Sequence, residues 1–344
     1  MPDEAKGFYF SMKHYALLLG ILTFFITSCG VDSKHFKIEG RILNMNQGEF
    51  YVYNDEGMID GIDTIKVEGG RFAYEMPCDR STTVMLVFPN FSEQPIYATS
   101  GKSVDIKGDA SHLKMLEVKG TKDNELMTKF RLQIANASPP ETKKYAGQFA
   151  EDHPESPVSV FLVKKYFVIA PSPDFKEAAR LIQILHEKQP TNGALNRMAM
   201  LIKGSDKVVI GAKLPTFTAY DTKGRLVSSA DLSSGLAIIS TWATWDYESM
   251  NQQRTIKEAV NNSRGRLKAV SICIDASRAD CLRQLKNDSI TWSNVCDGMM
   301  FENKTVRQLG LLRMPDNMLI KGGRIVDRCI PLQDLKMKIE ENLK

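Results

Sequence analysis

The stretch that most constrains the fold of this chain is residues 238–250, which read IISTWATWDYESM. An apolar run at residues 236–239 leads into two tryptophans and then Asp246, and a segment compatible with a helix continues to about residue 262. This pattern predicts a buried strand, a tight turn and the N-terminus of a helix. At such a place an α/β protein exposes backbone N–H groups and commonly carries its chemistry.

Patterns typical of strands and helices alternate from residue 207 to the end of the chain. A turn at residues 221–224 joins two short strand-like segments. After it come predicted strands at residues 236–240, 267–274, 291–295, 317–320 and 324–329 and predicted helices at residues 246–262, 277–286, 302–309 and 332–343. Together these segments predict an α/β domain over residues 207–344.

Two motifs in this domain resemble motifs of thioredoxin-like proteins. The run Trp-Ala-Thr-Trp at residues 242–245 is similar to the family's W-A-x-W, which C-x-x-C follows in the family. The sequence Arg313-Met314-Pro315 precedes a predicted strand and resembles the family's cis-proline segment, which faces the first redox cysteine. The order of elements is similar to that of the peroxiredoxin-related branch, with its extra N-terminal hairpin and inserted helix. The resemblance covers about residues 208–344 and implies a thioredoxin-like fold with a cis bond before Pro315.

The chain departs from the family at the two positions that carry the family's chemistry. Asp246 and Ser249 stand where the two cysteines would be. A dithiol site needs a thiolate at the helix N-terminus and a second thiol to resolve the mixed disulfide. Asp246 can cap the helix but cannot form a disulfide, and Ser249 has no base to activate it. We therefore expect no catalytic residue at this site.

The groove that frames the usual site is retained, and we expect it to bind an extended peptide, an envelope protein or a small ligand. Its backbone edge at the cis-proline segment suits the addition of an extended strand. The residues predicted to form this groove are Trp242, Trp245, Asp246, Met314 and Pro315.

Redox chemistry through other cysteines is the alternative hypothesis. Cys273 and Cys296 follow predicted strands, whose carboxyl ends lie near the functional face of an α/β sheet, and Cys281 lies on the intervening helix. These thiols could serve a thiol-disulfide oxidoreductase or a peroxiredoxin-like enzyme, or they could be small buried residues without chemistry. The chain has no C-x-x-C, the common spacing of dithiol and zinc sites, so we expect no metal and no cofactor.

The first half of the chain has a different pattern. Residues 35–120 contain short alternating segments separated by turn signals, which predicts an all-β, sandwich-like domain. The pattern resembles the uncharacterised β-domain that precedes thioredoxin-like domains in envelope lipoproteins. Residues 124–203 have the helical period, with prolines between the segments. The predicted organisation is a signal peptide with an N-terminal extension (1–28), a β-domain (29–120), a helical connector (121–206) and the thioredoxin-like domain (207–344).

The N-terminus indicates where the protein acts. Lys13 and His14 precede an apolar run at residues 15–27, and Ser28-Cys29-Gly30 resembles a bacterial lipobox in which Cys29 becomes lipidated. We expect a lipid-anchored, periplasm-facing protein of the bacterial cell envelope, with the outer membrane favoured. An ordinary secretory signal and an uncut membrane anchor are the alternatives. A net charge of +4 is too small to argue for a nucleic-acid partner.

Three functional hypotheses follow from these observations. The one we favour is an envelope lipoprotein that has lost the usual redox site and binds a protein, a peptide or a ligand in the retained groove. The enzyme hypothesis is thiol-disulfide exchange or peroxiredoxin-like activity through the other cysteines. The third hypothesis is a structural envelope component in which the fold is a scaffold.

Overall fold

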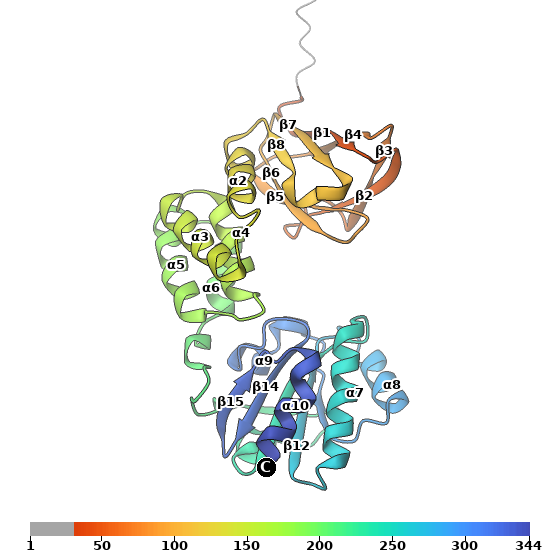
Figure 1. Cartoon of the computed structure of the whole chain (residues 1–344), viewed down its shortest axis with the longest axis vertical. Coiled ribbons are helices and arrows are strands. Elements are labelled where there is room, and N and C mark those ends of the chain that lie inside the picture. Colours follow the sequence, from red (N-terminus) through yellow and green to blue (C-terminus); the bar gives the residue numbers. More distant parts are fainter. Residues whose placement is uncertain (1–30) are drawn as a thin grey trace, which may run out of the picture. The chain divides into compact units, whose positions relative to one another are not determined.

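The computed structural model of the protein describes residues 31–344. The predicted signal segment at residues 1–28 and the predicted lipidation site, Cys29, lie outside these residues. The chain divides into two compact units, one ending at Asn136 and one beginning at Ala137, and each is described by itself (Figure 1). Within residues 31–344, no helix is both long enough and apolar enough to cross a membrane.

The first unit is built on one sheet of eight strands in the order β6-β5-β2-β3-β4-β1-β7-β8. Neighbouring strands are antiparallel except β1 and β7, which are parallel. The elements are β1 (His35–Leu43), β2 (Gln47–Tyr53), β3 (Ile62–Glu68), β4 (Arg71–Pro77), β5 (Thr82–Val87), β6 (Glu93–Ala98), β7 (Lys102–Asp109), the 3-10 helix η1 (Ala110–Met115), β8 (Glu117–Lys119) and α2 (Lys122–Gln133).

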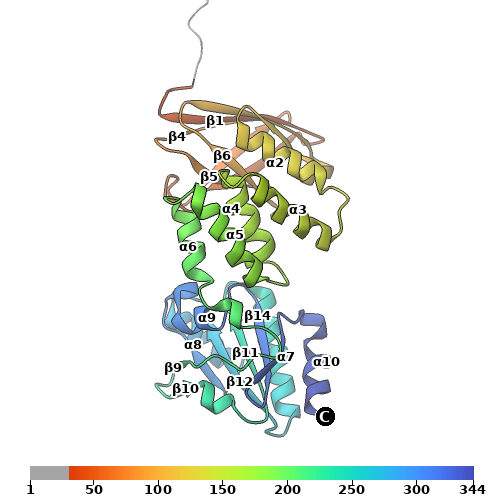
Figure 2. The ribbon, with the colours of Figure 1, turned by 90° about the vertical axis from the view of Figure 1, so that its left-hand side faces the viewer.

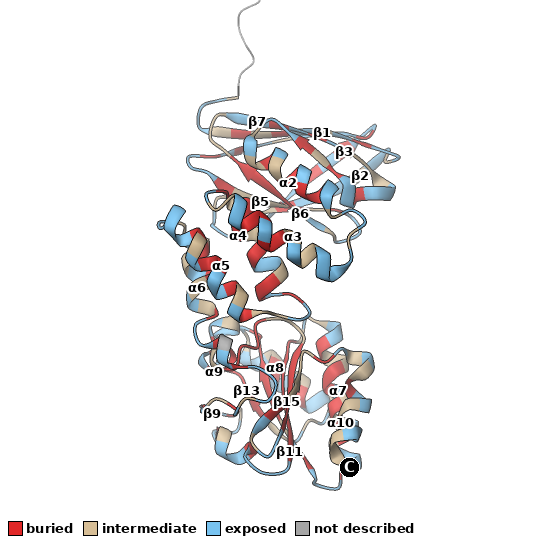
Figure 3. Ribbon diagram, turned by 60° about the vertical axis from the view of Figure 1, so that its left-hand side comes forward, coloured by how far each residue is buried: buried red, intermediate tan, exposed pale blue. Residues whose placement is uncertain are grey.

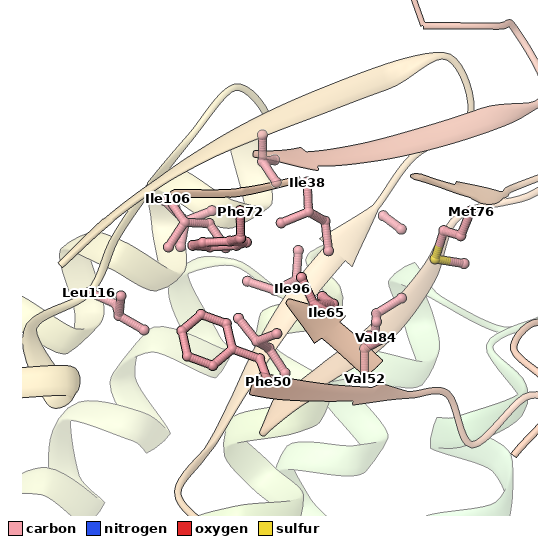
Figure 4. Packing of buried hydrophobic residues seen from close by; sticks show 14 of the residues in the cluster. Ile38, Phe50, Val52, Ile65, Phe72, Met76, Val84, Ile96, Ile106 and Leu116 are labelled. Atoms are coloured by element: carbon pink, nitrogen blue, oxygen red, sulfur yellow. The ribbon is translucent and has the colours of Figure 1, made fainter. Parts of the chain in front are cut away.

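This sheet folds over at its middle. Strands β3 and β4 share a single residue pair, Glu68 with Arg71, so the strands on either side are free to turn toward one another. Figure 4 shows Ile38 and Ile106 on one side of the resulting core and Phe50 on the other, all three fully buried. Alternation of buried and exposed residues along the strands supplies the two inner faces. The expected all-β, sandwich-like class is confirmed.

Helix α2 (Lys122–Gln133) packs on this sheet. Asn124 makes two hydrogen bonds to the backbone of Tyr97 in β6, at 3.0 and 2.8 Å. The hydroxyl of Thr128 accepts a hydrogen bond from the amide of Val118 in β8, at 3.0 Å. Strands β6 and β8 are the two edges of the sheet, so one helix ties both edges together. The segment that we expected to begin the connector is thus part of the first compact unit.

The second unit begins with a group of helices separated by prolines, as expected. Asp174 caps α5 by accepting a hydrogen bond from the amide of Glu177 at 3.0 Å. A π-helical turn continues directly from α4. The elements are α3 (Pro139–Asp152), α4 (Pro157–Val163), the π-helix η2 (Lys164–Val168), α5 (Phe175–Lys188), α6 (Gly193–Leu201) and the 3-10 helix η3 (Ser205–Lys207).

The rest of the second unit alternates strands and helices. A small two-stranded sheet, β10-β9, precedes a five-stranded sheet in the order β13-β12-β11-β14-β15. The elements are β9 (Thr218–Tyr220), β10 (Leu226–Ser228), η4 (Ser229–Leu232), β11 (Leu236–Trp242), α7 (Tyr247–Asn262), β12 (Leu267–Cys273), α8 (Arg278–Asn287), β13 (Ser293–Val295), η5 (Met300–Glu302), α9 (Lys304–Gln308), β14 (Asp316–Lys321), β15 (Arg324–Arg328) and α10 (Leu332–Leu343).

Helices cover both faces of the five-stranded sheet. Helices α7 and α10 lie side by side on one face, where Ile256 of α7 and Ile339 of α10 pack with Ile238 of β11 in one apolar cluster (Figure 2). Helix α8 lies on the other side of the sheet in the same view. The order of strands and helices after residue 207 is the expected one, and the thioredoxin-like α/β class is confirmed.

Candidate functional site

The candidate site is built at the C-terminal end of strand β11. Every residue of this strand is buried, because it is the central strand and has neighbours on both sides (Figure 3). It pairs with β12 in parallel, with Trp242 beside Cys273, and with β14 antiparallel, with Thr241 beside Asp316. The end of β11, the end of β12 and the beginning of β14 therefore meet at one edge of the sheet. The start of α7 follows at the same edge.

Asp246 and Ser249 seal the start of α7. The carboxylate of Asp246 accepts a hydrogen bond from the amide of Ser249 at 2.6 Å, as predicted for an N-cap. The Ser249 hydroxyl accepts a hydrogen bond from the amide of Ala243 at 3.1 Å and lies 2.9 Å from the carbonyl of Asp246, to which it donates. Ser249 is fully buried. The two residues in the cysteine positions are therefore structural parts of the turn.

The aromatic residues around this turn divide into a buried one and two exposed ones. Trp245 and Tyr247 are 61% and 71% exposed, and they flank Asp246. Trp242 is 2% exposed, and its indole N–H donates to the side chain of Asn294 at 3.1 Å. The prediction that Trp242 lines the groove is thus corrected, because its ring belongs to the core beneath the site. Trp245 lies where the prediction requires, on the surface.

The peptide bond between Met314 and Pro315 is cis, as the resemblance implied. Thr241 holds this segment against β11, because its hydroxyl accepts from the amide of Asp316 at 2.9 Å and lies 3.2 Å from the carbonyl of Arg313. Within residues 31–344, the backbone amide and carbonyl of Met314 take part in no hydrogen bond. The segment therefore presents a backbone edge that an extended strand could extend.

Two glutamines that the sequence did not reveal fix the floor of the site. The side-chain amide of Gln252 donates to the carbonyls of Thr241 and Asp316, each at 3.2 Å, and thus joins α7 to both strands of the site. Gln253 accepts a hydrogen bond from the hydroxyl of Ser271 in β12 at 3.0 Å. Both glutamines are buried. Gln252 and Gln253 follow the buried Ser249 by three and four residues, which places them on the same face of α7. This spacing was the signal in the sequence that they would be buried.

Asp316 is a second buried polar group that the sequence did not reveal. It is fully buried, and its Oδ1 atom lies 3.7 Å from Nε of Arg313. Burial raises the pKa of Asp316 to about 6, while the charges of Arg313 and Arg328 act in the opposite direction. The neighbouring thiol of Cys329 has a pKa raised to about 11, by burial and then by the charge of Asp316. This group lies directly after the cis-proline.

The structure brings together the three cysteines of the alternative hypothesis. The sulfur atoms of Cys273, Cys281 and Cys296 all lie within 4.8 Å of one another. All three thiols are free, and their residues are 1%, 0% and 4% exposed, respectively. Trp242 packs against them. We call these three residues the thiol cluster.

The thiols of the cluster differ in acidity. Hydrogen bonds from Cys273 and Cys281, with a further one from the amide of Gly298, lower the pKa of Cys296. Hydrogen bonds to its two sulfur neighbours and then burial raise the pKa of Cys273. The chain has five histidines, and none follows residue 186, so this domain has no imidazole to act as a base for a thiol or a serine. The three sulfurs are thus close enough together for thiol chemistry, but the core encloses them.

Comparisons with known proteins found matches to parts of the chain. Residues 36–127 match a family described as a domain of unknown function, DUF4369. This match spans the strands of the first unit and about half of α2. A search of curated proteins gave no match.

Solved structures similar to parts of this chain include proteins from three Bacteroides species. A thioredoxin-like protein from Bacteroides caccae is 14% identical over 62% of this chain and 87% of its own, with a TM-score of 0.42. A thiol-disulfide oxidoreductase from Bacteroides fragilis is 25% identical over 38% of this chain and 98% of its own, with a TM-score of 0.35. The thioredoxin domain of a thiol-disulfide oxidoreductase from Bacteroides vulgatus is 17% identical over 40% of this chain and 99% of its own, with a TM-score of 0.36.

Proposed function

We propose that the thioredoxin-like domain is a non-redox binding module that holds an extended peptide, as part of an envelope protein, at the end of β11. The observation that carries the proposal is the state of the two cysteine positions. Asp246 caps the helix, and the buried Ser249 hydroxyl is held in the turn, so neither can exchange a disulfide. The surface of a redox site is present without its reactive groups.

Two features of that surface suit an extended peptide. The backbone of Met314 can pair with a peptide strand, which supplies affinity that does not depend on sequence. The exposed rings of Trp245 and Tyr247 offer apolar and aromatic contact for the side chains of the same peptide. Rigid support comes from Thr241, which fixes the segment around Pro315.

The test is selection of unstructured peptides from a displayed library on the purified protein, followed by calorimetry with one selected peptide. We expect Trp245→Ala and Met314→Glu each to weaken binding by at least about tenfold, which corresponds to about 1.4 kcal/mol. The matched control is Tyr220→Ala, which removes an equally exposed aromatic side chain, 70% exposed, from β9. Methylation of the peptide's backbone amides should also weaken binding.

Two outcomes would contradict this proposal. One is equal loss of binding with Tyr220→Ala and with Trp245→Ala, because exposed aromatic residues anywhere would then suffice. The other is acceleration of insulin reduction by the wild-type protein that Cys273→Ser or Cys296→Ser abolishes. The convergence of the thiol cluster favours this oxidoreductase as the second candidate function. The burial of the thiol cluster, whose residues are at most 4% exposed, argues against this function, because a partner disulfide must reach the attacking sulfur.

The proposed address is the bacterial cell envelope, with a lipid on Cys29 and the protein facing the periplasm at the outer membrane. Its support is the sequence of the N-terminus, where an apolar run ends in small residues before Cys29. We expect Cys29→Ser to release the protein from sedimented membranes into the soluble fraction. Continued sedimentation of Cys29→Ser with the membranes would contradict the lipid anchor and favour an uncut apolar segment.

A further inference from the structure

We propose that the thiol cluster, Cys273, Cys281 and Cys296, is a binding site for one Cu(I) ion, held by three thiolate ligands. This site is separate from the proposed peptide groove, and neither proposal depends on the other. It also departs from the expectation of no metal, which rested on the absence of C-x-x-C spacing. The ligands here converge by folding and not by sequence spacing.

The three sulfurs come from three different segments of the fold. Cys273 is the last residue of β12, Cys281 lies in the first turns of α8, and Cys296 directly follows β13. Each pair of sulfur atoms lies within 4.8 Å. A metal–sulfur bond of about 2.3 Å places three sulfurs around one ion at about 4 Å from one another. The cluster therefore needs to contract little to surround an ion.

The geometry favours a metal over a disulfide. A disulfide joins two sulfurs at about 2.05 Å and leaves the third without a partner. In this cluster all three sulfurs are mutual neighbours, and the three residues are almost completely enclosed. Oxidation by a partner protein requires contact between its disulfide and one of these sulfurs, and 4% exposure at most does not permit that contact. A small ion needs only local opening of the fold to enter.

The ligand set favours Cu(I) among thiophilic ions. Zinc in proteins takes four ligands in tetrahedral geometry, and structural sites supply all four. The described residues 31–344 offer only the three cysteines at ligand spacing, and the chain has no histidine after residue 186. The carboxylate of Asp275, two residues after Cys273, already accepts a hydrogen bond from the amide of Thr244 at 3.0 Å. Three soft thiolates suit Cu(I), which does not require a fourth ligand.

Binding is a proton exchange without electron transfer. Three S–H bonds break, three Cu–S bonds form, three protons leave to solvent, and copper stays in the +1 state. The bound trithiolate carries two negative charges, which the N-terminal end of α8 and the guanidinium of Arg278 offset. The carboxylates of Asp275 and Asp280 oppose this effect from the same side.

The surroundings suit an ion that must be kept from water and oxygen. Trp242, Leu285 and Ile290 pack around the three sulfurs. The Trp242 side chain is fixed by its hydrogen bond to Asn294, so this wall is rigid. An enclosed apolar shell of this kind controls solvent access and the potential of a bound metal.

The test is titration of the full-length, fully reduced protein with Cu(I) under anaerobic conditions against bicinchoninate as a coloured competitor. We expect one Cu(I) per chain, and X-ray absorption of the loaded protein should show copper bound by three sulfurs. Cys281→Ser and Cys296→Ser should each reduce the affinity at least about 100-fold. Cys78→Ser is the matched control, because Cys78 is an equally buried thiol that lies in the first unit, and it should leave the affinity unchanged.

The absorption measurement uses the unaltered protein, so the proposal remains testable even where a serine variant fails to fold. Three outcomes would overturn it. The first is no Cu(I) uptake by protein whose three thiols are shown to be reduced. The second is a stable disulfide between two cluster cysteines in freshly isolated protein, which would support the redox hypothesis. The third is tighter binding of Zn(II) than of Cu(I) to the same residues.

Discussion

A working dithiol site combines an accessible surface with two thiols. In this domain the start of helix α7 has the accessible surface, and the thiol cluster has the thiols. At the start of α7 the surface is open, with Trp245 and Tyr247 more than half exposed, but the reactive positions are Asp246 and Ser249. In the thiol cluster three cysteines lie together, yet they are at most 4% exposed. Access and thiols have separated in this domain, although both regions adjoin the end of β11.

This difference shows that the frame of a dithiol site can be present where residues other than cysteine stand at its two thiol positions. A helix N-terminus stabilises a carboxylate at its cap as readily as a thiolate, so Asp246 fits the frame without strain on the backbone. The buried cysteines lack such an exposed position and behave as small core residues until a ligand enters.

Placing two thiols in the open region should give the start of α7 a dithiol activity of its own. In the double variant Asp246→Cys with Ser249→Cys, the helix N-terminus lowers the pKa of the first thiol, so about half of it is ionised near neutral pH. We expect insulin reduction by dithiothreitol at a rate at least about tenfold above that with wild-type protein. Turbidity of precipitating insulin measures it. A folded double variant without this gain would show that the frame at Pro315 no longer serves disulfide exchange.

The difference in access should appear within one molecule. In the single variant Asp246→Cys, the introduced thiol lies at a partly exposed position while the thiol cluster stays enclosed. We expect iodoacetamide to modify the introduced thiol at least about 100-fold faster than Cys273 or Cys296, because local opening of a core costs several kcal/mol. Peptide mapping by mass spectrometry gives each rate. Equal rates would mean that the cluster opens readily, and the enzyme hypothesis would then gain support.

The buried carboxyl group of Asp316, which follows the cis-proline segment, should make the stability of the protein depend on pH. Asp316 binds its proton more tightly in the folded protein, with a pKa of about 6, than in the unfolded chain. Its contribution to the free energy of unfolding is therefore fully present below pH 4 and is lost as the pH rises to about 6, by at most about 3 kcal/mol. In Asp316→Asn this fall should be absent. Urea unfolding from pH 4 to pH 7 compares the two, and parallel curves would contradict the assignment.

The turn at the start of α7, held by the hydroxyl of Ser249, should contribute to the free energy of unfolding. Ser249→Ala leaves the buried amide of Ala243 without its hydrogen-bond acceptor, and we expect the free energy of unfolding to fall by about 1–3 kcal/mol. Thr255→Ala, on the same helix, is the control, because its hydroxyl bonds only a carbonyl within α7 and is half-buried. That variant should change stability by less than about 0.5 kcal/mol. Similar losses in both variants would mean that Ser249 has no special role.

Local features of this domain could be predicted from the sequence. The cap at Asp246 follows from residue type and position, and the cis bond before Pro315 followed from the resemblance. The order of strands and helices after residue 207 follows from hydrophobic period and turn residues. Each of these features depends on residues that are close in sequence.

Features that depend on contacts between distant segments could not be predicted. Nothing in the spacing of the three cysteines shows that their sulfurs meet, because the curvature of the sheet and the angle of α8 decide it. The burial of Asp316 is likewise hidden, since a lone aspartate after a proline is typical of an exposed turn. The prediction that Trp242 lines the groove was wrong, because Trp242 is the last residue of the central strand β11, in which every residue is buried.

Helix α2 has a consequence for how the β-sheet unit meets other chains. The two edge strands of an open sheet carry unpaired amides and carbonyls, and such edges invite pairing with another molecule. Here the side chain of Asn124 hydrogen-bonds the backbone of Tyr97 on one edge, and the hydroxyl of Thr128 hydrogen-bonds the backbone amide of Val118 on the other. A single helix thus protects the sheet from intermolecular strand pairing at both ends. Loss of α2 alone would turn a self-contained unit into one prone to aggregation at two places.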